Sequence, residues 1–258
     1  MPSSTYYYHI AQLCKKDKYA NERQRISAIF LHHNKRYGYR RVYLQMRNEG
    51  YKINHKTVQM LMQQMHLKSN VRKVKYRSYK GEVGKIAPNI LNRDFKAAMP
   101  NKKWATDVTE FKINGVKAYL SPIIDMFNGE IISYTISERP DLKMVLDMMR
   151  KAKQKISKTK GIILHSDQGW HYQNAKYQQK IKQYGMIQSM SRKGNCLDNA
   201  VMENFFGIMK SELLYLQQFN TMEEFKRELD SYILYYNFQR IKLKLNGKSP
   251  VGFRTLSQ

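Results

Sequence analysis

Three acidic residues stand at positions where a charged side chain needs compensation. Asp107 lies in the middle of the β-rich stretch WATDVTEF, Asp167 ends the apolar run GIILHSD, and Glu203 falls in the first turns of a predicted helix. A carboxylate within or beside an apolar strand is costly unless its charge is offset. Mg²⁺ can offset it, because this ion prefers oxygen ligands and combines one or two carboxylates with phosphate oxygens. We therefore predict that Asp107, Asp167 and Glu203 are both metal ligands and catalytic groups.

The chemistry that suits such a site is phosphodiester transfer. Two Mg²⁺ ions, for which Mn²⁺ can substitute, would lie about 3.5–4 Å apart and clamp an in-line displacement. One ion lowers the pKa of the attacking water or 3′-hydroxyl, and the other stabilises the leaving oxygen. Each acid alone has a plainer explanation, as the partner of a lysine, a turn cap or an exposed helix residue. The three acids together, with their flanking motifs, favour the catalytic interpretation.

The predicted helix around Glu203 also carries a lysine. Glu203 and Lys210 are seven residues apart, which places them about 20° apart around the helix axis. Both face away from an apolar stripe formed by Met202, Phe205, Phe206, Met209 and Leu213. Lys210 is therefore placed to contact a DNA phosphate near the metal ions, although a lysine on a helix can also be merely solvated.

The segment SRKGNCLDNAV leads into that helix. Arg192 and Lys193 add positive charge, and Asp198 or Asn199 can cap the helix. We expect Arg192, Lys193 and Asn199 to contact DNA, the alternative being an ordinary basic turn. His165 is expected to be buried beside the acids, and His171 to be a DNA contact or a surface residue. A zinc site is not expected, since Cys14 and Cys196 are far apart and have no CxxC spacing.

Charge points to the same partner. The 258 residues include 46 Lys and Arg against 20 Asp and Glu, a formal net charge of +26. Such an excess repels itself in the folded state, and nucleic acid is the usual polyanion that relieves it. No apolar run approaches the ~20 residues of a membrane span, and MPSSTYYYHI does not resemble a signal peptide. We therefore expect a cytoplasmic, nucleoid-associated protein with no membrane partner.

The first part of the chain, residues 1–67, is predicted to be a helical region. Helices are expected over Glu22–His33 and Arg40–Asn48, followed by a third that Asn54 caps. Short helices and tight turns favour a helix-turn-helix, in which Lys56 and Gln59 lie on the exposed face of the third helix and contact DNA. A plain helical bundle is the alternative. Residues 68–100 are expected to be a basic linker.

Residues 101–220 are predicted to form the catalytic core. Three antiparallel strands over WATDVTEF, KAYLSPIID and EIISYTIS are followed by strand–helix alternation, which implies a mixed sheet flanked by helices. Pro122 suggests an edge strand or an irregularity. The expected helices are Leu142–Ile156, Gln173–Tyr184 and Asp198–Gln217. Residues 221–258 are expected to hold a helix that begins with a capping box at Thr221, followed by a loop-like basic tail from Arg240.

Three motifs carry a resemblance to a known family. WATDVTEF, HSDQG and SRKGNCLDNAVMENFFGIMKSE resemble the catalytic core of bacterial insertion-sequence transposases, in particular the second reading frame (OrfB) of family three. Thirty-five residues separate Asp167 from Glu203, as in the integrase acidic triad, and Lys210 stands where the family has a basic residue. The segments YGYRRVYLQMRNEGYKINHKTVQMLM and YYNFQRIKLKLNGKSPVGF resemble its helix-turn-helix and C-terminal motifs. Lys242 departs from the histidine often found in the latter.

This resemblance implies an α/β fold with an RNase H-like core, a five-stranded mixed sheet with flanking helices, preceded by a small all-α helix-turn-helix domain. It implies binding to the double-stranded terminal inverted repeats of a mobile element and to target DNA. The implied chemistry is metal-dependent 3′-end cleavage followed by strand transfer by a homo-oligomer on DNA. It also implies a partner region from an upstream reading frame, joined by frameshifting. The alternatives are an RNase H-like nuclease that does not join strands and a DNA-binding protein without catalytic activity.

Overall fold

The computed structural model describes residues 17–69, 86–192 and 196–256 of the chain. These residues fall into two compact units, divided between Asn70 and Val71. None of the helices in the described ranges is long and apolar enough to span a membrane.

The N-terminal unit consists of three short helices, α2 (Ala20–His32), α3 (Tyr39–Asn48) and α4 (His55–Gln64). Their positions confirm the three helices predicted from the sequence, with starts that differ by one or two residues. The predicted helix boundaries are also explained locally: Gly50 adopts a φ of +90° after α3, and the Asn54 side chain accepts a hydrogen bond from the Lys56 N–H. The helices enclose a small apolar core made of Ile26, Ile29, Phe30, Val42, Met46, Val58, Leu61 and Met62.

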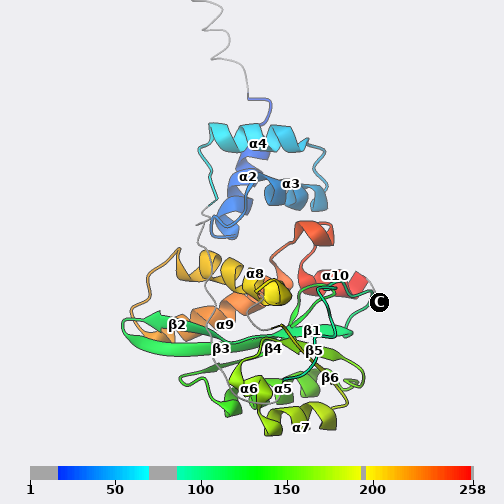
Figure 1. Cartoon of the computed structure of the whole chain (residues 1–258). Coiled ribbons are helices and arrows are strands. Elements are labelled where there is room, and N and C mark those ends of the chain that lie inside the picture. Colours follow the sequence, from blue (N-terminus) through cyan, green and yellow to red (C-terminus); the bar gives the residue numbers. More distant parts are fainter. Residues whose placement is uncertain (1–16, 70–85, 193–195, 257–258) are drawn as a thin grey trace, which may run out of the picture. The chain divides into compact units, whose positions relative to one another are not determined.

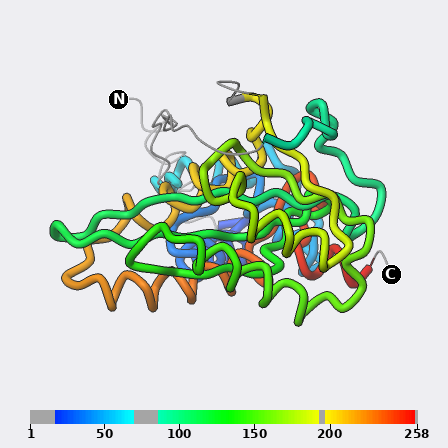
Figure 2. The backbone as a smooth tube through the Cα atoms, turned by 60° about the horizontal axis from the view of Figure 1, so that its bottom comes forward, coloured from blue at the N-terminus to red at the C-terminus, as the bar shows by residue number. Residues whose placement is uncertain are grey.

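The second unit is built on a mixed sheet. Its strands are β1 (Lys103–Thr106), β2 (Thr109–Ile113), β3 (Val116–Asp125), β4 (Ile131–Ser137), β5 (Ile163–Ser166) and β6 (Ile187–Met190). β3 is antiparallel to β1, β2 and β4, whereas β1, β5 and β6 run parallel to one another. The β2–β3 hairpin extends to one side of the other strands (Figures 1 and 2).

The expectation that Asp107 lies in the middle of a strand is wrong. Because the predicted first strand is two strands, β1 and β2, the described sheet has six strand segments in place of the expected five. The predicted first strand is interrupted after Thr106, and its two halves, β1 and β2, both pair with β3. The interruption lies opposite Pro122, which has no N–H for the ladder. Pro122 is thus an irregularity, as predicted, but not on an edge, because β3 has neighbours on both sides.

Helices cover both faces of this sheet (Figure 1). On one face, α5 (Leu142–Lys155), α6 (Trp170–Gln173) and α7 (Ala175–Gln183) enclose a core around Trp104 and Ile123. On the other face, α8 (Ala200–Met209) and α9 (Met222–Phe238) enclose a second core around Phe111 and Leu120. The apolar stripe predicted for α8 lies in this second core, which leaves the opposite side of the helix available for polar residues.

Two predicted segments differ from the structure, and a third is confirmed with a shifted start. The helix expected over Gln173–Tyr184 is α7, which begins two residues later because the Asn174 side chain caps it, and the short helix α6 precedes it. The helix expected over Asp198–Gln217 is a 3₁₀ turn (Cys196–Asn199), then α8, then a π-helical turn (Lys210–Leu214). The tail after Arg240 is not loop-like: it contains a 3₁₀ turn (Leu243–Leu245) and α10 (Pro250–Leu256), which Arg254 ties to Asp125 and Glu130.

The end of the predicted linker packs on the second unit. The backbone N–H of Ile90 donates to Ser189 Oγ at 3.0 Å, the Met190 N–H donates to the Pro88 carbonyl at 3.3 Å, and the Leu91 side chain is buried. These contacts hold the segment against β6. Residues 86–100 therefore belong structurally to the second unit.

Candidate active site

The parallel pairing of β1 and β5 brings two of the three acids together. Ala105 pairs with His165, so the same register carried two residues further places Asp107 beside Asp167. Both acids thus leave the sheet at the carboxyl ends of neighbouring parallel strands, an edge where side chains converge into functional sites. The sequence predicted that Asp167 ends an apolar strand, and the structure confirms this. It did not predict that the first strand ends before Asp107.

The Asp107 carboxyl group lies in an unfavourable electrostatic environment. Its side chain is buried, and this burial, together with the charges of Asp167 and Glu203, raises its pKa well above the usual range. Two hydrogen bonds act in the opposite direction, from the Val108 N–H to Oδ1 at 2.7 Å and from Asn199 Nδ2 to Oδ2 at 2.8 Å. Of these effects, the charge of Glu203 on α8 is the smallest.

Asp167 is held by the turn that follows it. Burial raises the pKa of its carboxyl group, while the Gly169 N–H, which donates to Oδ1 at 2.8 Å, and the neighbouring His171 lower it. A Cβ atom at position 169 would lie 2.9 Å from Oδ1 of Asp167. Residue 169 is therefore glycine because the carboxylate occupies the space of a side chain, a constraint that the HSDQG motif alone did not reveal.

The turn before α8 is fixed by Asp198, whose importance the sequence did not indicate. Its fully buried carboxylate accepts five hydrogen bonds, three from Arg192 and one each from Arg93 and Asn89. These donors hold the pKa of Asp198 well below its usual range, with the Arg192 side chain as the largest cause. The Asp198 carbonyl in turn accepts a hydrogen bond from His165 Nε2 at 2.9 Å. The prediction that Asp198 or Asn199 caps α8 through its side chain is wrong, because both side chains are used elsewhere.

Lys210 lies at the end of α8, on the side of the acids. Its ammonium group is 5.5 Å from the centre of the Phe111 ring. Burial lowers its pKa, while Glu110 and Asp107 act to raise it. A partly buried cation near these carboxylates is suited to an anionic group brought into the site. The DNA contact itself remains a prediction.

The other predicted DNA contacts are scattered. Lys56 is exposed and Gln59 is half-buried on α4 of the N-terminal unit, as a helix-turn-helix requires. Arg192 is half-exposed and bound to Asp198, so half of its surface remains open to a partner. Asn199 is buried beside Asp107, which does not suit the expected DNA contact at the surface. Lys193 lies outside the described residues.

The two histidines that flank Asp167, His165 and His171, are both buried. His165 contacts Ser189 Oγ through Nδ1 and the Asp198 carbonyl through Nε2, and its side chain is buried, as predicted. The expectation that His171 lies at the surface is wrong: its Nε2 atom is 2.6 Å from the Pro140 carbonyl, and its ring stacks on Trp170. His171 thus ties α6 to the loop before α5, and its burial lowers its pKa while the nearby Asp167 acts to raise it.

The donor set fits a divalent cation by its chemistry. Asp107, Asp167 and Glu203 offer only carboxylate oxygens, the ligands that Mg²⁺ and Mn²⁺ prefer. A cation would offset the like charges that raise the pKa of Asp107. Within the described residues, however, no three acidic, histidine or cysteine side chains already stand close enough to hold one ion. An ion held by all three acids would therefore require their side chains to come closer together.

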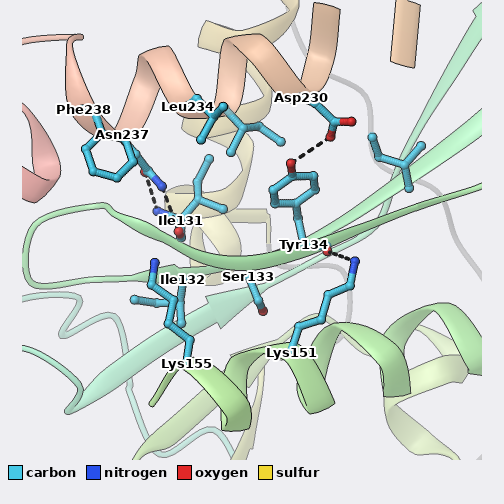
Figure 3. Close-up of a pocket in the computed structure, with 12 residues that line it drawn as sticks. Ile131, Ile132, Ser133, Tyr134, Lys151, Lys155, Asp230, Leu234, Asn237 and Phe238 are labelled. Atoms are coloured by element: carbon cyan, nitrogen blue, oxygen red, sulfur yellow. Dashed lines mark hydrogen bonds between the residues drawn. The ribbon is translucent and has the colours of Figure 1, made fainter. Parts of the chain in front are cut away.

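A cavity of about 610 Å³ lies elsewhere, between β4, α5 and α9 (Figure 3). In it, the Asn237 side chain pairs with both the N–H and the carbonyl of Ile131, and Lys151 donates to the Tyr134 carbonyl. Among the described residues, β4 pairs with β3 along one edge only. On its other edge, these side chains bind backbone groups that could otherwise pair with a strand of another chain. None of the three acids lines this cavity.

Comparisons with known protein families agree with this architecture. An integrase core domain matches residues 97–196, which include Asp107 and Asp167. A second integrase core domain matches residues 203–257, which begin at Glu203, and an HTH-like domain matches residues 16–75. Each of the two structural units thus has its own family counterpart.

Individual relatives extend over nearly the whole chain. The putative transposase InsK for insertion sequence element IS150 of Escherichia coli K12 is 54% identical, over 98% of this chain and 90% of the relative. The transposase for insertion sequence element IS904 of Lactococcus lactis is 38% identical, over 89% and 92%. The transposase InsF for insertion sequence IS3A of E. coli K12 is 32% identical, over 88% and 80%.

A solved structure supports the fold. The cryoEM structure of the simian T-cell lymphotropic virus intasome, in complex with PP2A regulatory subunit B56 gamma, matches 82% of this chain and 69% of that chain. The TM-score is 0.50 at 17% identity. At this identity the likeness concerns the fold alone, and it confirms the RNase H-like core expected from the sequence.

Proposed function

The chain belongs to the insertion-sequence transposases of the IS3 family with an integrase catalytic core, and we propose that it cleaves 3′ ends and transfers strands at the terminal inverted repeats of its element. The observation that carries this proposal is the buried carboxyl group of Asp107, whose pKa is raised by its burial and by the charges of Asp167 and Glu203. A buried carboxylate beside others of like charge is costly for a fold, and functional sites are where such costs concentrate.

In the proposed reaction, Asp107, Asp167 and Glu203 would hold two Mg²⁺ or Mn²⁺ ions. Bound divalent cations supply charge neutralisation at the phosphate and a lowered pKa for the attacking hydroxyl. The protein's own contribution is to hold the carboxylates in place, through Val108 and Asn199 at Asp107 and through Gly169 at Asp167. Lys210 would bind a phosphate of the DNA strand beside the acids, where its charge is only partly solvated.

The N-terminal unit would bind the element ends. Its third helix, α4, presents Lys56 and Gln59 in the position of a recognition helix. Phosphate contacts by the many basic residues of the chain would add affinity that falls with salt. We further propose that the protein assembles on DNA as a homo-oligomer, together with the product of an upstream reading frame, so that both element ends and the target DNA are held at once.

A product assay tests this function directly. The protein would be incubated with Mg²⁺ and a labelled duplex that carries an element end, with and without the upstream-frame product. The proposal expects a nick at the 3′ end of the element and covalently joined products. Cleavage at the element end without joining would instead identify a nuclease of the same fold. Binding without any cleavage, in both mixtures, would identify a DNA-binding protein without catalytic activity.

A further inference from the structure

The Asn199 side chain is buried beside Asp107. Asn199 is the last residue before α8, four residues ahead of Glu203, and only 7% of its surface is exposed. Its Nδ2 atom donates to Oδ2 of Asp107 at 2.8 Å, a contact between residues 92 positions apart in the chain. The Asn199 side chain therefore lies at the acidic site and not on the surface of the preceding loop.

The other half of the Asn199 amide is unsatisfied. Its Oδ1 atom is buried and has no hydrogen-bond partner among the described residues. An unsatisfied buried polar atom costs about 1–3 kcal/mol, and in native structures such atoms call for an explanation in terms of function or a missing ion or water. The orphaned atom sits on a side chain that already touches Asp107, so a donor that enters with the ion bound by Asp107 would satisfy it.

The backbone gives this side chain a fixed place. Asp198, the residue before it, is locked by five hydrogen bonds from Arg192, Arg93 and Asn89, and by the bond from His165 to its carbonyl. The 3₁₀ turn (Cys196–Asn199) is thereby anchored to β5 and to the segment that packs on β6. An amide supported in this manner can hold a carboxylate at a constant orientation, as residues surrounding metal ligands do.

We propose that Asn199 is a positioning residue of the metal site, an inference that rests on the function proposed above. Its Nδ2–H group orients the Asp107 carboxylate, and its Oδ1 atom accepts a hydrogen bond from a water molecule in the hydration shell of the ion that Asp107 binds. Asparagine suits this position because it offers a donor and an acceptor without charge. An aspartate there would add a fourth negative charge to a site that already contains three.

Metal binding by the full-length protein without DNA tests this role. Mn²⁺ would be titrated into the wild type, Asn199→Ala, Asp107→Ala and a control, Asn204→Ala, while free Mn²⁺ is followed by electron paramagnetic resonance. Asn204 is exposed on the same helix, five residues along, and is the matched asparagine. Loss of a residue that supports a metal ligand typically weakens binding by about 10–100-fold. We expect that loss for Asn199→Ala, unchanged affinity for Asn204→Ala, and no tight binding for Asp107→Ala.

The outcomes separate this inference from the proposed function. If the wild type binds Mn²⁺ through Asp107 but Asn199→Ala binds it equally well, the positioning role is wrong and the proposed function stands. If the wild type binds no Mn²⁺, the metal-dependent function itself fails. Strand transfer as a function of Mn²⁺ concentration guards against a misfolded variant. Activity of Asn199→Ala should return at high Mn²⁺ with an unchanged KM for DNA, and a defect that persists at every concentration would overturn the inference.

Discussion

Arg240 and Glu212 form a buried ion pair that joins the end of α9 to the π-helical turn after α8. Arg240 Nε donates to Glu212 Oε2 at 2.7 Å, and Arg240 Nη2 lies 2.6 Å from Oε1. The Tyr232 hydroxyl donates to the same carboxylate at 3.0 Å. The pair thus ties the end of α9 to the turn that begins at Lys210 and continues the helix that carries Glu203.

Loss of one member of this pair should be strongly destabilising. The side chains of Arg240 and Glu212 are only 2% and 9% exposed, so Arg240→Ala leaves an uncompensated buried carboxylate, at a cost of about 3–5 kcal/mol. Urea unfolding followed by tryptophan fluorescence measures this, since Trp104 is buried in the sheet. Arg150→Ala, which breaks an exposed pair with Asp147, should cost no more than about 1 kcal/mol. Equal losses for the two variants would show that the buried pair is not important for stability.

Gly169→Ala should impair the active site without unfolding the protein. The added methyl group would lie 2.9 Å from Oδ1 of Asp167 and would displace the carboxylate. We expect at least a tenfold loss of strand transfer, in the range seen when the support of a metal ligand is disturbed, about 10–100-fold. Gly207→Ala is the matched control, because a Cβ atom there meets nothing within 4 Å on α8. Full activity of Gly169→Ala would mean that Asp167 does not need its observed position.

Lys210→Ala should weaken DNA processing and leave metal binding intact. The ammonium group lies beside Phe111 and is attracted by Glu110 and Asp107, but it carries no metal ligand atom. The predicted change is a rise in KM for DNA, a smaller slope of activity against salt, and unchanged Mn²⁺ affinity. Lys226→Ala, at an ion pair with Glu138, serves as the comparison. An unaltered salt slope for Lys210→Ala would count against a phosphate contact.

Asp107→Asn should stabilise the metal-free protein at neutral pH while it abolishes catalysis. Burial and nearby carboxylates raise the pKa of Asp107, so the folded chain retains its proton to higher pH than the unfolded chain. The stability contributed by the protonated form is therefore present at low pH and lost as pH rises through the folded pKa. A neutral amide removes that loss, by about 0.5–2 kcal/mol at pH 7, the usual yield of a stabilising change.

Thermal unfolding without metal, as a function of pH, checks this linkage. The advantage of Asp107→Asn over the wild type should be largest near pH 7 and should shrink as pH falls. Asp147→Asn, on the exposed side of α5, should show no comparable stabilisation. A variant less stable than the wild type at pH 7 would show that Asp107 is not repelled by its neighbours.

Most of the elements could be predicted from the sequence because their signals are local. Asn54 and Thr221 accept hydrogen bonds from the first turns of their helices as the patterns suggested, and the apolar stripe of α8 is buried. The end of β1 could not be predicted, since it depends on the register that sets Pro122 of β3 opposite it. Likewise, the partners of Asp198 come from residues more than one hundred positions earlier as well as from Arg192.

The candidate site shows the same division. The residue types and spacing of Asp107, Asp167 and Glu203 pointed to phosphoryl transfer, because buried carboxylates are rare without a reason. The contact of Asn199 with Asp107 could not be predicted, since an asparagine before a helix is most simply explained as a cap. Only the pairing of β1 with β5 and the anchoring of the turn before α8 reveal that its amide reaches Asp107.

The most direct test of the three-acid site is a single-turnover joining assay with a pre-cleaved, labelled element end and a target duplex. Wild type, Asp107→Ala, Asp167→Ala and Glu203→Ala would be compared in Mg²⁺, in Mn²⁺ and without metal, with DNA binding measured in parallel. We predict joined products from the wild type only, only with metal, and near-normal DNA binding by all four proteins. Joined products from any of the three variants, or from the wild type without metal, would contradict the assignment of these acids as the metal-dependent catalytic site.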